Sequence, residues 1–201
     1  MNENKDLINQ SINPFNLFEK WFADAEKKEI NDPNAMNLST ISQDSKPSSR
    51  MVLLKNFDNE GFVFYTNINS KKGRSISHNP NVSLNFHWKS LLRQIRIEGI
   101  VTQVSDDEAD KYYNTRPKES RIGAWASKQS EELTERKNLE ENIEFYQSKF
   151  KDNIIKRPPH WCGFRVKPNL IEFWQDMPFR LHDRLEFIKK NNEWISRKLY
   201  P

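Results

Sequence analysis

The sequence has little of several residue types on which common protein chemistries depend. It contains one cysteine, Cys162, which excludes an intramolecular disulfide and a cysteine-based zinc site. Its four histidines lie far apart, without the spacing of a metal-binding motif. Only five glycines are present, and none forms the glycine-rich fingerprint of a Rossmann fold or a P-loop. We therefore expect no metal and neither of these nucleotide-binding folds.

Long apolar runs are also missing. No stretch approaches the roughly 20 apolar residues that a membrane-spanning helix needs. The first 13 residues are polar and lack the apolar segment of a signal peptide. We expect a cytoplasmic protein with no membrane partner, a flexible tail over residues 1–13 and a single domain over residues 14–201.

Charged and aromatic residues, in contrast, are plentiful. Charged residues make up 30% of the 201 residues and the net charge is +4, which favours anionic partners such as phosphorylated small molecules or nucleic acid. Thirteen Phe, six Trp and five Tyr indicate a packed core rich in aromatic side chains. The apolar fraction, 35%, is modest, so association between copies would add stability.

Short apolar segments separated by turn residues predict a mainly β protein with helical insertions. Asn13-Pro14 predicts the start of an amphipathic helix that ends near Ile30. Gly99 lies where the alternation of one strand slips, which is typical of a bulge. Strands are expected at 35–42, 50–55, 62–66, 82–88, 91–104, 161–166, 171–174, 184–188 and 194–199, and further helices at 70–78, 105–116 and 134–150. Because no βαβ alternation is visible, a small, mostly antiparallel barrel is the expected architecture, with 50–55 and 62–66 as a hairpin.

Two stretches carry the candidate chemistry. Lys71, Lys72 and Arg74 lie in the first turn of the expected helix at 70–78, where cations oppose the helix dipole unless an anion is bound. Arg180 and Arg184 flank His182 at two-residue spacing, and an extended chain would place all three on one face. The alternative for both stretches is a set of solvated charges.

The second stretch resembles a known family. Ile171-Glu172-Phe173-Trp174-Gln175, followed by Arg180-Leu181-His182-Asp183-Arg184, is similar to the C-terminal signature of pyridoxine/pyridoxamine 5′-phosphate oxidases, here spanning residues 160–201. Further matches are 50–55, 64–67, 70–72, 93–94, Tyr112, 116–117 and 120–130. The resemblance covers residues 14–201.

The resemblance implies a split β-barrel homodimer that binds FMN between its subunits. It further implies oxidation of pyridoxine or pyridoxamine 5′-phosphate at C4′ to pyridoxal 5′-phosphate, with O₂ as acceptor, hydrogen peroxide as product and ammonia released from the amine. The implied FMN contacts are Arg50, Met51, Val52, Leu53, Leu54, Lys55, Tyr65, Thr66, Lys71, Lys72, Gln94, Gln129, Ser130, Trp174 and Arg184. The implied substrate contacts are Lys55, Tyr112, Arg116, Ser120, Arg180 and His182.

Arg180 and His182 are the implied catalytic pair, which would hold the substrate ring against the flavin. No strong general base is evident, so positioning would supply most of the rate. Two features depart from the family: position 71 is Lys where Arg is common, and no Arg-x-x-Tyr arm precedes Pro14.

Two other functions compete with this one. A split-barrel flavoprotein could act on another phosphorylated substrate, and a basic barrel could bind nucleic acid. The cations form two local clusters instead of a continuous stripe, which disfavours nucleic acid. An assay with pyridoxine 5′-phosphate separates the two flavoprotein hypotheses.

Overall fold

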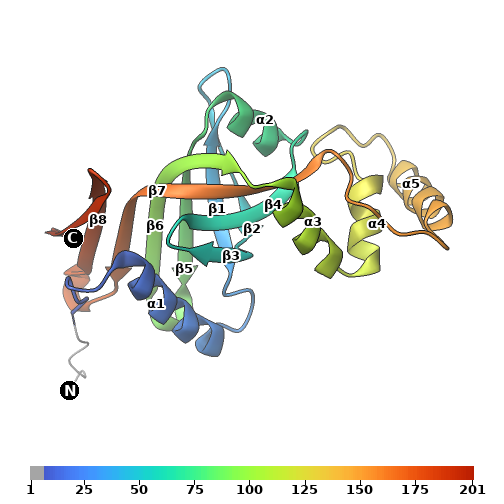
Figure 1. Cartoon of the computed structure of the whole chain (residues 1–201). Coiled ribbons are helices and arrows are strands. Elements are labelled where there is room, and N and C mark those ends of the chain that lie inside the picture. The colour runs from blue at the N-terminus through green and yellow to red at the C-terminus, as the bar shows by residue number, and fades with distance from the viewer. Residues whose placement is uncertain (1–6) are drawn as a thin grey trace.

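The computed structural model describes residues 7–201, in which nine strands form one antiparallel sheet that curls into a barrel-like shell (Figure 1). The sheet order is β2-β1-β5-β6-β7-β4-β3, and β8 and β9 extend it from β7. The strands are β1 (Ala35–Ile41), β2 (Pro47–Leu53), β3 (Asn56–Asp58), β4 (Gly61–Asn67), β5 (Asn81–Trp88), β6 (Arg93–Gln103), β7 (Trp161–Gln175), β8 (Asp183–Lys190) and β9 (Glu193–Leu199). The mainly β prediction is confirmed.

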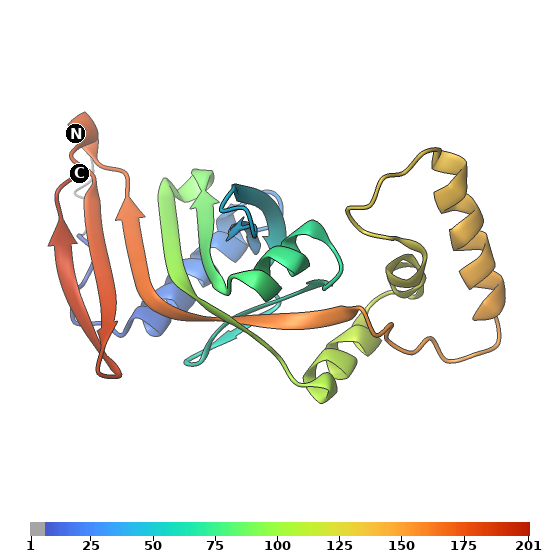
Figure 2. The same cartoon turned by 90° about the horizontal axis from the view of Figure 1, so that it is seen from above.

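Five α-helices are seen within residues 7–201: α1 (Pro14–Lys28), α2 (Lys71–His78), α3 (Asp106–Thr115), α4 (Lys118–Ala126) and α5 (Arg136–Lys149). The predicted caps are present, since the Ser70 and Ser105 side chains accept hydrogen bonds from Gly73 N and Glu108 N. Helix α4 was not predicted, and no side chain caps its start. The helices α3 to α5 lie at the end of the molecule opposite β8 (Figures 1 and 2).

Helix α1 covers the core of the barrel. The Asn13 side chain accepts a hydrogen bond from Phe15 N at 2.9 Å, and Pro14 occupies the first helical turn. Phe18 is fully buried, and its ring centre lies 4.9 Å from that of Phe62 on β4 and 5.4 Å from that of Phe86 on β5. Burying one such side chain stabilises the fold by about 1.5–3 kcal/mol.

The segment before α1 contacts the C-terminal hairpin. Ile8 is buried, its N–H donates to Asp183 Oδ2 at 2.7 Å, and its carbonyl oxygen accepts from Lys198 Nζ at 3.1 Å. The predicted flexible tail, residues 1–13, has its first six residues outside the described part of the chain. The predicted division at residue 14 stays a prediction.

The hairpin predicted from 50–55 and 62–66 is wrong in its pairing. Strand β2 pairs with β1 along its whole length, and the short strand β3 is the hairpin partner of β4. The chain leaves β2 at Leu54, whose side chain turns into the core, and Lys55 N then donates to Val63 O at 2.8 Å. A left-handed Gly61, with φ of 138°, closes the turn.

Strand β7 was predicted as two strands but is continuous over 15 residues. Its register with β6 shifts where Glu98 pairs with Leu170 and Gly99 with Pro168, so Asn169 is an extra residue on β7. The bulge predicted at Gly99 is therefore confirmed, with the extra residue on the partner strand. Pro168 is tolerated because a bulge does not require its missing N–H.

The prediction that Arg180, His182 and Arg184 share the face of one strand is wrong. Residues Pro178–Arg180 form a 3₁₀ turn, in which Phe179 and Arg180 have φ of 59° and 63°, and β8 begins at Asp183. Of the three side chains, only Arg184 projects from a strand.

Candidate functional site

Most of the predicted site residues from the first two thirds of the chain line one cavity of about 460 Å³. The cavity lies where β2, β4 and the start of α2 meet the connection between α3 and α4. Its lining residues are Met51, Val52, Leu53, Lys55, Tyr65, Thr66, Lys72, Tyr112, Thr115, Arg116, Pro117, Ser120, Gln129 and Trp161. A second hollow of about 380 Å³ adjoins it and shares Arg116, Ser120 and Gln129.

Stacked aromatic rings form one wall of this cavity. The ring centre of Tyr65 lies 4.1 Å from that of Tyr112 and 5.1 Å from that of Trp161, with the rings nearly parallel. Burial, with the nearby Glu108 carboxylate, raises the pKa of Tyr65 to about 12, so the phenol keeps its proton at neutral pH. The wall is therefore apolar and flat, with hydroxyl groups at its edge.

Arg116 is a cation without a counter-ion in this wall. It follows α3, which ends where Pro117 disfavours helix, and its guanidinium carbon lies 5.0 Å from the Trp161 ring centre. Its Nη1 is buried and has no hydrogen-bond partner. Burial lowers the pKa of Arg116. Among residues 7–201 it forms no ion pair, so an anion bound in the cavity would supply the missing counter-charge.

Two further cations lie close to each other, Lys72 at the start of α2 and Arg50 on β2. Lys72 Nζ lies 3.1 Å from Gln129 Oε1, and burial followed by repulsion from Arg50 lowers the Lys72 pKa. Arg50 donates to Leu38 O at 3.1 Å, Ser48 O at 2.9 Å and the Thr40 hydroxyl at 2.8 Å. Neither cation has a carboxylate partner within the described residues. The N–H groups of Arg50 are thus largely used within the protein, and Arg50 contributes mainly its positive charge to this region. Lys72, in contrast, lines the cavity.

Several predicted residues lie beside the cavity instead of lining it. Leu54 is buried in the core, and Lys71 is exposed on α2 next to Lys72. Ser130 is exposed with φ of 72°, one residue after Gln129. Their predicted flavin contacts stay predictions.

The remaining predicted residues gather at the far end of the sheet. Gln94 pairs with Trp174, Trp174 pairs with Arg184, and the His182 ring centre lies 4.5 Å from that of Trp174. His182 Nδ1 lies 3.1 Å from Asp176 Oδ1, and Arg180 is exposed.

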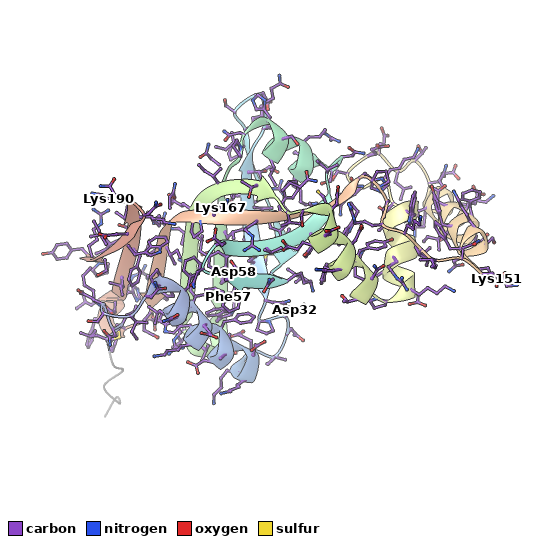
Figure 3. The ribbon with its side chains drawn as sticks, in the orientation of Figure 1. Asp32, Phe57, Asp58, Lys151, Lys167 and Lys190 are labelled. Carbon is purple, nitrogen blue, oxygen red and sulfur yellow. The ribbon has the colours of Figure 1, made fainter. Side chains whose placement is uncertain are left out.

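Strand β7 separates the two groups. At about 3.3 Å per residue, the path along β7 from Trp161 to Trp174 is roughly 43 Å. Lys151, just after α5, and Lys190, at the end of β8, lie at opposite ends of the molecule (Figure 3). One chain therefore does not bring both groups to one small ligand.

Trp161 was predicted only as the start of a strand, although the Arg116 guanidinium packs over its ring. No sequence signal singles it out, because its role comes from packing against residues almost 50 positions earlier. Thr115 and Pro117 were also missed as lining residues, but they flank a predicted one.

Within residues 7–201, no group of three or more His, Cys, Asp or Glu side chains could hold a metal ion. No helix in that range is both long and apolar enough to span a bilayer.

Comparisons with known structures define the class of protein. The fold matches a pyridoxamine 5′-phosphate oxidase-related, FMN binding protein from Nostoc punctiforme, with a TM-score of 0.76 at 15% identity, over 95% of this chain and 100% of that one. It also matches PhzG from Burkholderia lata in complex with tetrahydrophenazine-1-carboxylic acid, with a TM-score of 0.89 at 30% identity, over 94% and 92%. The protein thus has a split-barrel fold, and the predicted fold is confirmed.

Sequence comparisons define the family. Residues 22–149 match the family described as pyridoxamine 5′-phosphate oxidase, and residues 161–201 match the pyridoxine 5′-phosphate oxidase C-terminal dimerisation region. Curated relatives from Brucella canis and Brucella suis, both named pyridoxine/pyridoxamine 5′-phosphate oxidase, are 53% identical over the full length of both chains. The chain belongs to the pyridoxamine 5′-phosphate oxidase family.

Proposed function

We propose that this protein is an FMN-dependent oxidase that converts pyridoxine or pyridoxamine 5′-phosphate to pyridoxal 5′-phosphate. The observation that carries the proposal is a single cavity lined by two separate cations, Arg116 and Lys72, which have no carboxylate partner within residues 7–201, with the charge of Arg50 close to Lys72. Two cation groups suit two phosphates, one from a cofactor and one from a substrate. The curated relatives carry the same activity in their names.

The cofactor would lie at the start of α2. Lys72 would hold the FMN phosphate, and Arg50 would add positive charge behind it, with Thr66 and Gln129 beside them. The mutual repulsion of these two cations, neither of which has a carboxylate partner in the described residues, fits a dianion at this place. When bound, FMN would accept the hydride removed from C4′ and pass the electrons to O₂, giving hydrogen peroxide.

The substrate phosphate would lie at Arg116. Lys55, Tyr112 and Ser120 line the same cavity and complete a charged and hydroxyl-bearing cradle. The stacked rings of Tyr65, Tyr112 and Trp161 exclude water from one side. With the alcohol substrate, loss of two hydrogens gives the aldehyde directly. With the amine, addition of water and release of ammonia follow.

The site would be completed by a second copy of the chain. Arg180 and His182, proposed to hold the substrate ring, belong to the connection between β7 and β8, which lies at the end of the molecule opposite α3 to α5 (Figure 2). A homodimer that places the β8 end of one copy against the cavity of the other would bring them together, and the match to a dimerisation region over residues 161–201 supports it. We place this dimer in the cytoplasm as part of the proposal.

A direct assay tests the proposal. The purified protein, saturated with FMN, is incubated with pyridoxine 5′-phosphate and separately with pyridoxamine 5′-phosphate in air. Pyridoxal 5′-phosphate and hydrogen peroxide should form in equal amounts, and light scattering should give a dimer. Flavin binding without product from either substrate would contradict the proposed reaction.

One alternative keeps a specific observation in its favour. PhzG, at 30% identity, was solved with a ligand that its name describes as a tetrahydrophenazine carboxylic acid, so this fold accepts other anions. This alternative would be favoured if the protein turned over such a carboxylate but neither pyridoxine 5′-phosphate nor pyridoxamine 5′-phosphate. The cluster of Lys55, Tyr112, Arg116 and Ser120 favours a phosphate.

A further inference from the structure

A row of four charged side chains crosses the sheet on the face that carries Trp174 and Arg184. The strand register pairs Arg96 with Glu172, Glu172 with Glu186, and Glu186 with Arg197. The two glutamates face each other, although like charges directly opposite in a sheet are unfavourable. Their side chains are only 4% and 5% exposed. Such an arrangement persists only because each carboxylate has its own arginine partners.

Glu172 serves two arginines at once. Its Oε2 accepts hydrogen bonds from Arg96 Nη2 at 2.6 Å and Nε at 3.1 Å, and its Oε1 accepts from Arg184 Nε at 2.7 Å. Burial acts to raise the Glu172 pKa, but the bonds from Arg184 and Arg96 outweigh it and hold that pKa below its usual value. Glu172 is therefore ionised at neutral pH.

These contacts fix the direction in which Arg184 points. Arg184 Nε and Nη2 both lie 2.7 Å from Glu172 Oε1, and Nη1 donates to the Tyr200 carbonyl at 2.9 Å. A guanidinium has five N–H groups, and these contacts occupy three of them. Two donors therefore remain for a ligand, on a side chain that is already ordered and loses little freedom on binding.

We propose that Glu172 is a positioning residue of the flavin site, which acts by holding the Arg184 guanidinium in its binding orientation. The inference rests on the proposed function, in which Arg184 contacts FMN across the dimer. Glu186, directly opposite, forms no hydrogen bond or ion pair with Arg184 among the described residues and accepts from Arg197 Nε at 2.6 Å, so we expect it to stabilise the sheet without serving the flavin.

A double-mutant cycle tests the inference through FMN affinity. The full-length dimer is stripped of flavin, and the FMN dissociation constant is measured by quenching of flavin fluorescence for wild type, Glu172→Gln, Arg184→Ala and the double variant. Glu172→Gln should weaken FMN roughly tenfold, the lower end for loss of a supporting contact. In the Arg184→Ala background the same change should add less than twofold, because its effect passes through Arg184. Full additivity overturns the inference.

Glu186→Gln is the matched control, because it removes an equally buried carboxylate from the same row. Its melting temperature should fall about as far as that of Glu172→Gln, with FMN affinity within twofold of wild type. Equal loss of FMN affinity in both variants would mean that general loosening of the sheet is the cause, and the inference would fail.

A second variant covers the case in which Glu172→Gln does not fold. Glu172→Asp keeps the charge, but its shorter side chain does not reach both arginines, so FMN affinity should again fall and the change should again vanish beside Arg184→Ala. Unchanged FMN affinity in Glu172→Asp overturns the inference. If Arg184→Ala alone leaves FMN affinity unchanged, the inference fails while the proposed oxidase reaction stands. If wild type does not bind FMN, the proposed function itself fails.

Discussion

The two ends of the molecule handle charge in opposite ways. At the cavity end, Arg116 and Lys72 are partly buried cations without carboxylate partners in the described chain. At the β8 end, Arg184 is bound to Glu172 and His182 lies beside Asp176. Unpaired buried charge is costly, so it marks where a ligand is to bind. The pairs at the β8 end need no ligand to offset their burial, so these side chains are already ordered when a second copy of the chain approaches.

Arg116→Met tests the unpaired end most strongly. It should lower kcat/KM for pyridoxine 5′-phosphate by about 10²-fold, roughly 2.7 kcal/mol, mostly through KM, because a charge-assisted phosphate contact is lost. The melting temperature should not fall, since the variant also removes a buried cation without a counter-ion. Arg121→Met is the control, because Arg121 Nε is also buried without a partner but does not line the cavity. An unchanged KM in Arg116→Met would remove Arg116 from the substrate site.

Arg180→Ala tests whether the β8 end serves the substrate. Because Arg180 is exposed in the single chain, its loss should leave the fold, the flavin spectrum and FMN affinity nearly intact. Turnover per bound flavin, as kcat/KM, should fall by about 10²-fold if the side chain clamps the substrate ring. His182→Ala should act in the same direction but less, since one neutral hydrogen bond is worth about 0.5–1.5 kcal/mol. Flavin loss with unchanged turnover per flavin would assign both residues a structural role.

Mixed dimers test whether one site takes residues from both ends. Arg116→Ala and Arg180→Ala chains, each nearly inactive alone, are co-expressed with different tags. A mixed dimer would contain one site with both defects and one intact site, so an equal mixture should regain about a quarter of wild-type activity. Arg116→Ala mixed with Lys55→Ala should regain none, because both residues line the cavity of one copy. Mixed dimers that stay inactive would rule out a shared site.

Lys72→Ala should have a smaller effect than Arg116→Met or Arg180→Ala. It should weaken FMN binding by roughly tenfold, about 1.5 kcal/mol, and leave the KM for pyridoxine 5′-phosphate at saturating FMN unchanged. Arg74→Ala, an exposed cation on the same helix, is the control. Equal FMN affinity in wild type and Lys72→Ala would mean that the charged side chains at the start of α2 are exposed to solvent and do not bind the FMN phosphate.

The pH dependence sharpens the Lys72 prediction. The Lys72 pKa lies below the usual 10.5 because of burial and then Arg50, so the apoprotein loses this proton before the unfolded chain does. Between those two pKa values the unfolded state binds more protons, and the contribution of Lys72 to apoprotein stability rises with pH. FMN affinity should fall over the same interval, because the phosphate needs the charged lysine. In Lys72→Arg, which does not titrate there, both dependences should disappear.

Local side-chain signals predicted much of the fold. Ser70, Ser105 and the pair Asn13-Pro14 each place a helix start correctly, because a cap acts within three residues of itself. Helix α4 has no such cap. The turn at Phe179-Arg180 escaped prediction because both adopt left-handed φ without the glycine or asparagine that usually marks it.

For the candidate site, the identity of most residues was predicted but their arrangement in space was not. The resemblance supplied the individual residues, and the structure gathers most of those from residues 51–129 in one cavity. It did not supply the distance between that cavity and Trp174, nor the place of Trp161 under Arg116. Both depend on how a strand of 15 residues crosses the sheet, which no local signal contains.

The extra residue in β7 reverses which side of the strand the odd- and even-numbered side chains face. Before Asn169 the buried core positions are the even ones, Phe164 and Val166, and after it they are the odd ones, Ile171 and Phe173. If the strand ran through Asn169 without the bulge, the even positions would stay inward, and Trp174 would point into the core while Phe173 faced outward. The bulge at Asn169 therefore decides which side chains of the C-terminal signature face out of the barrel.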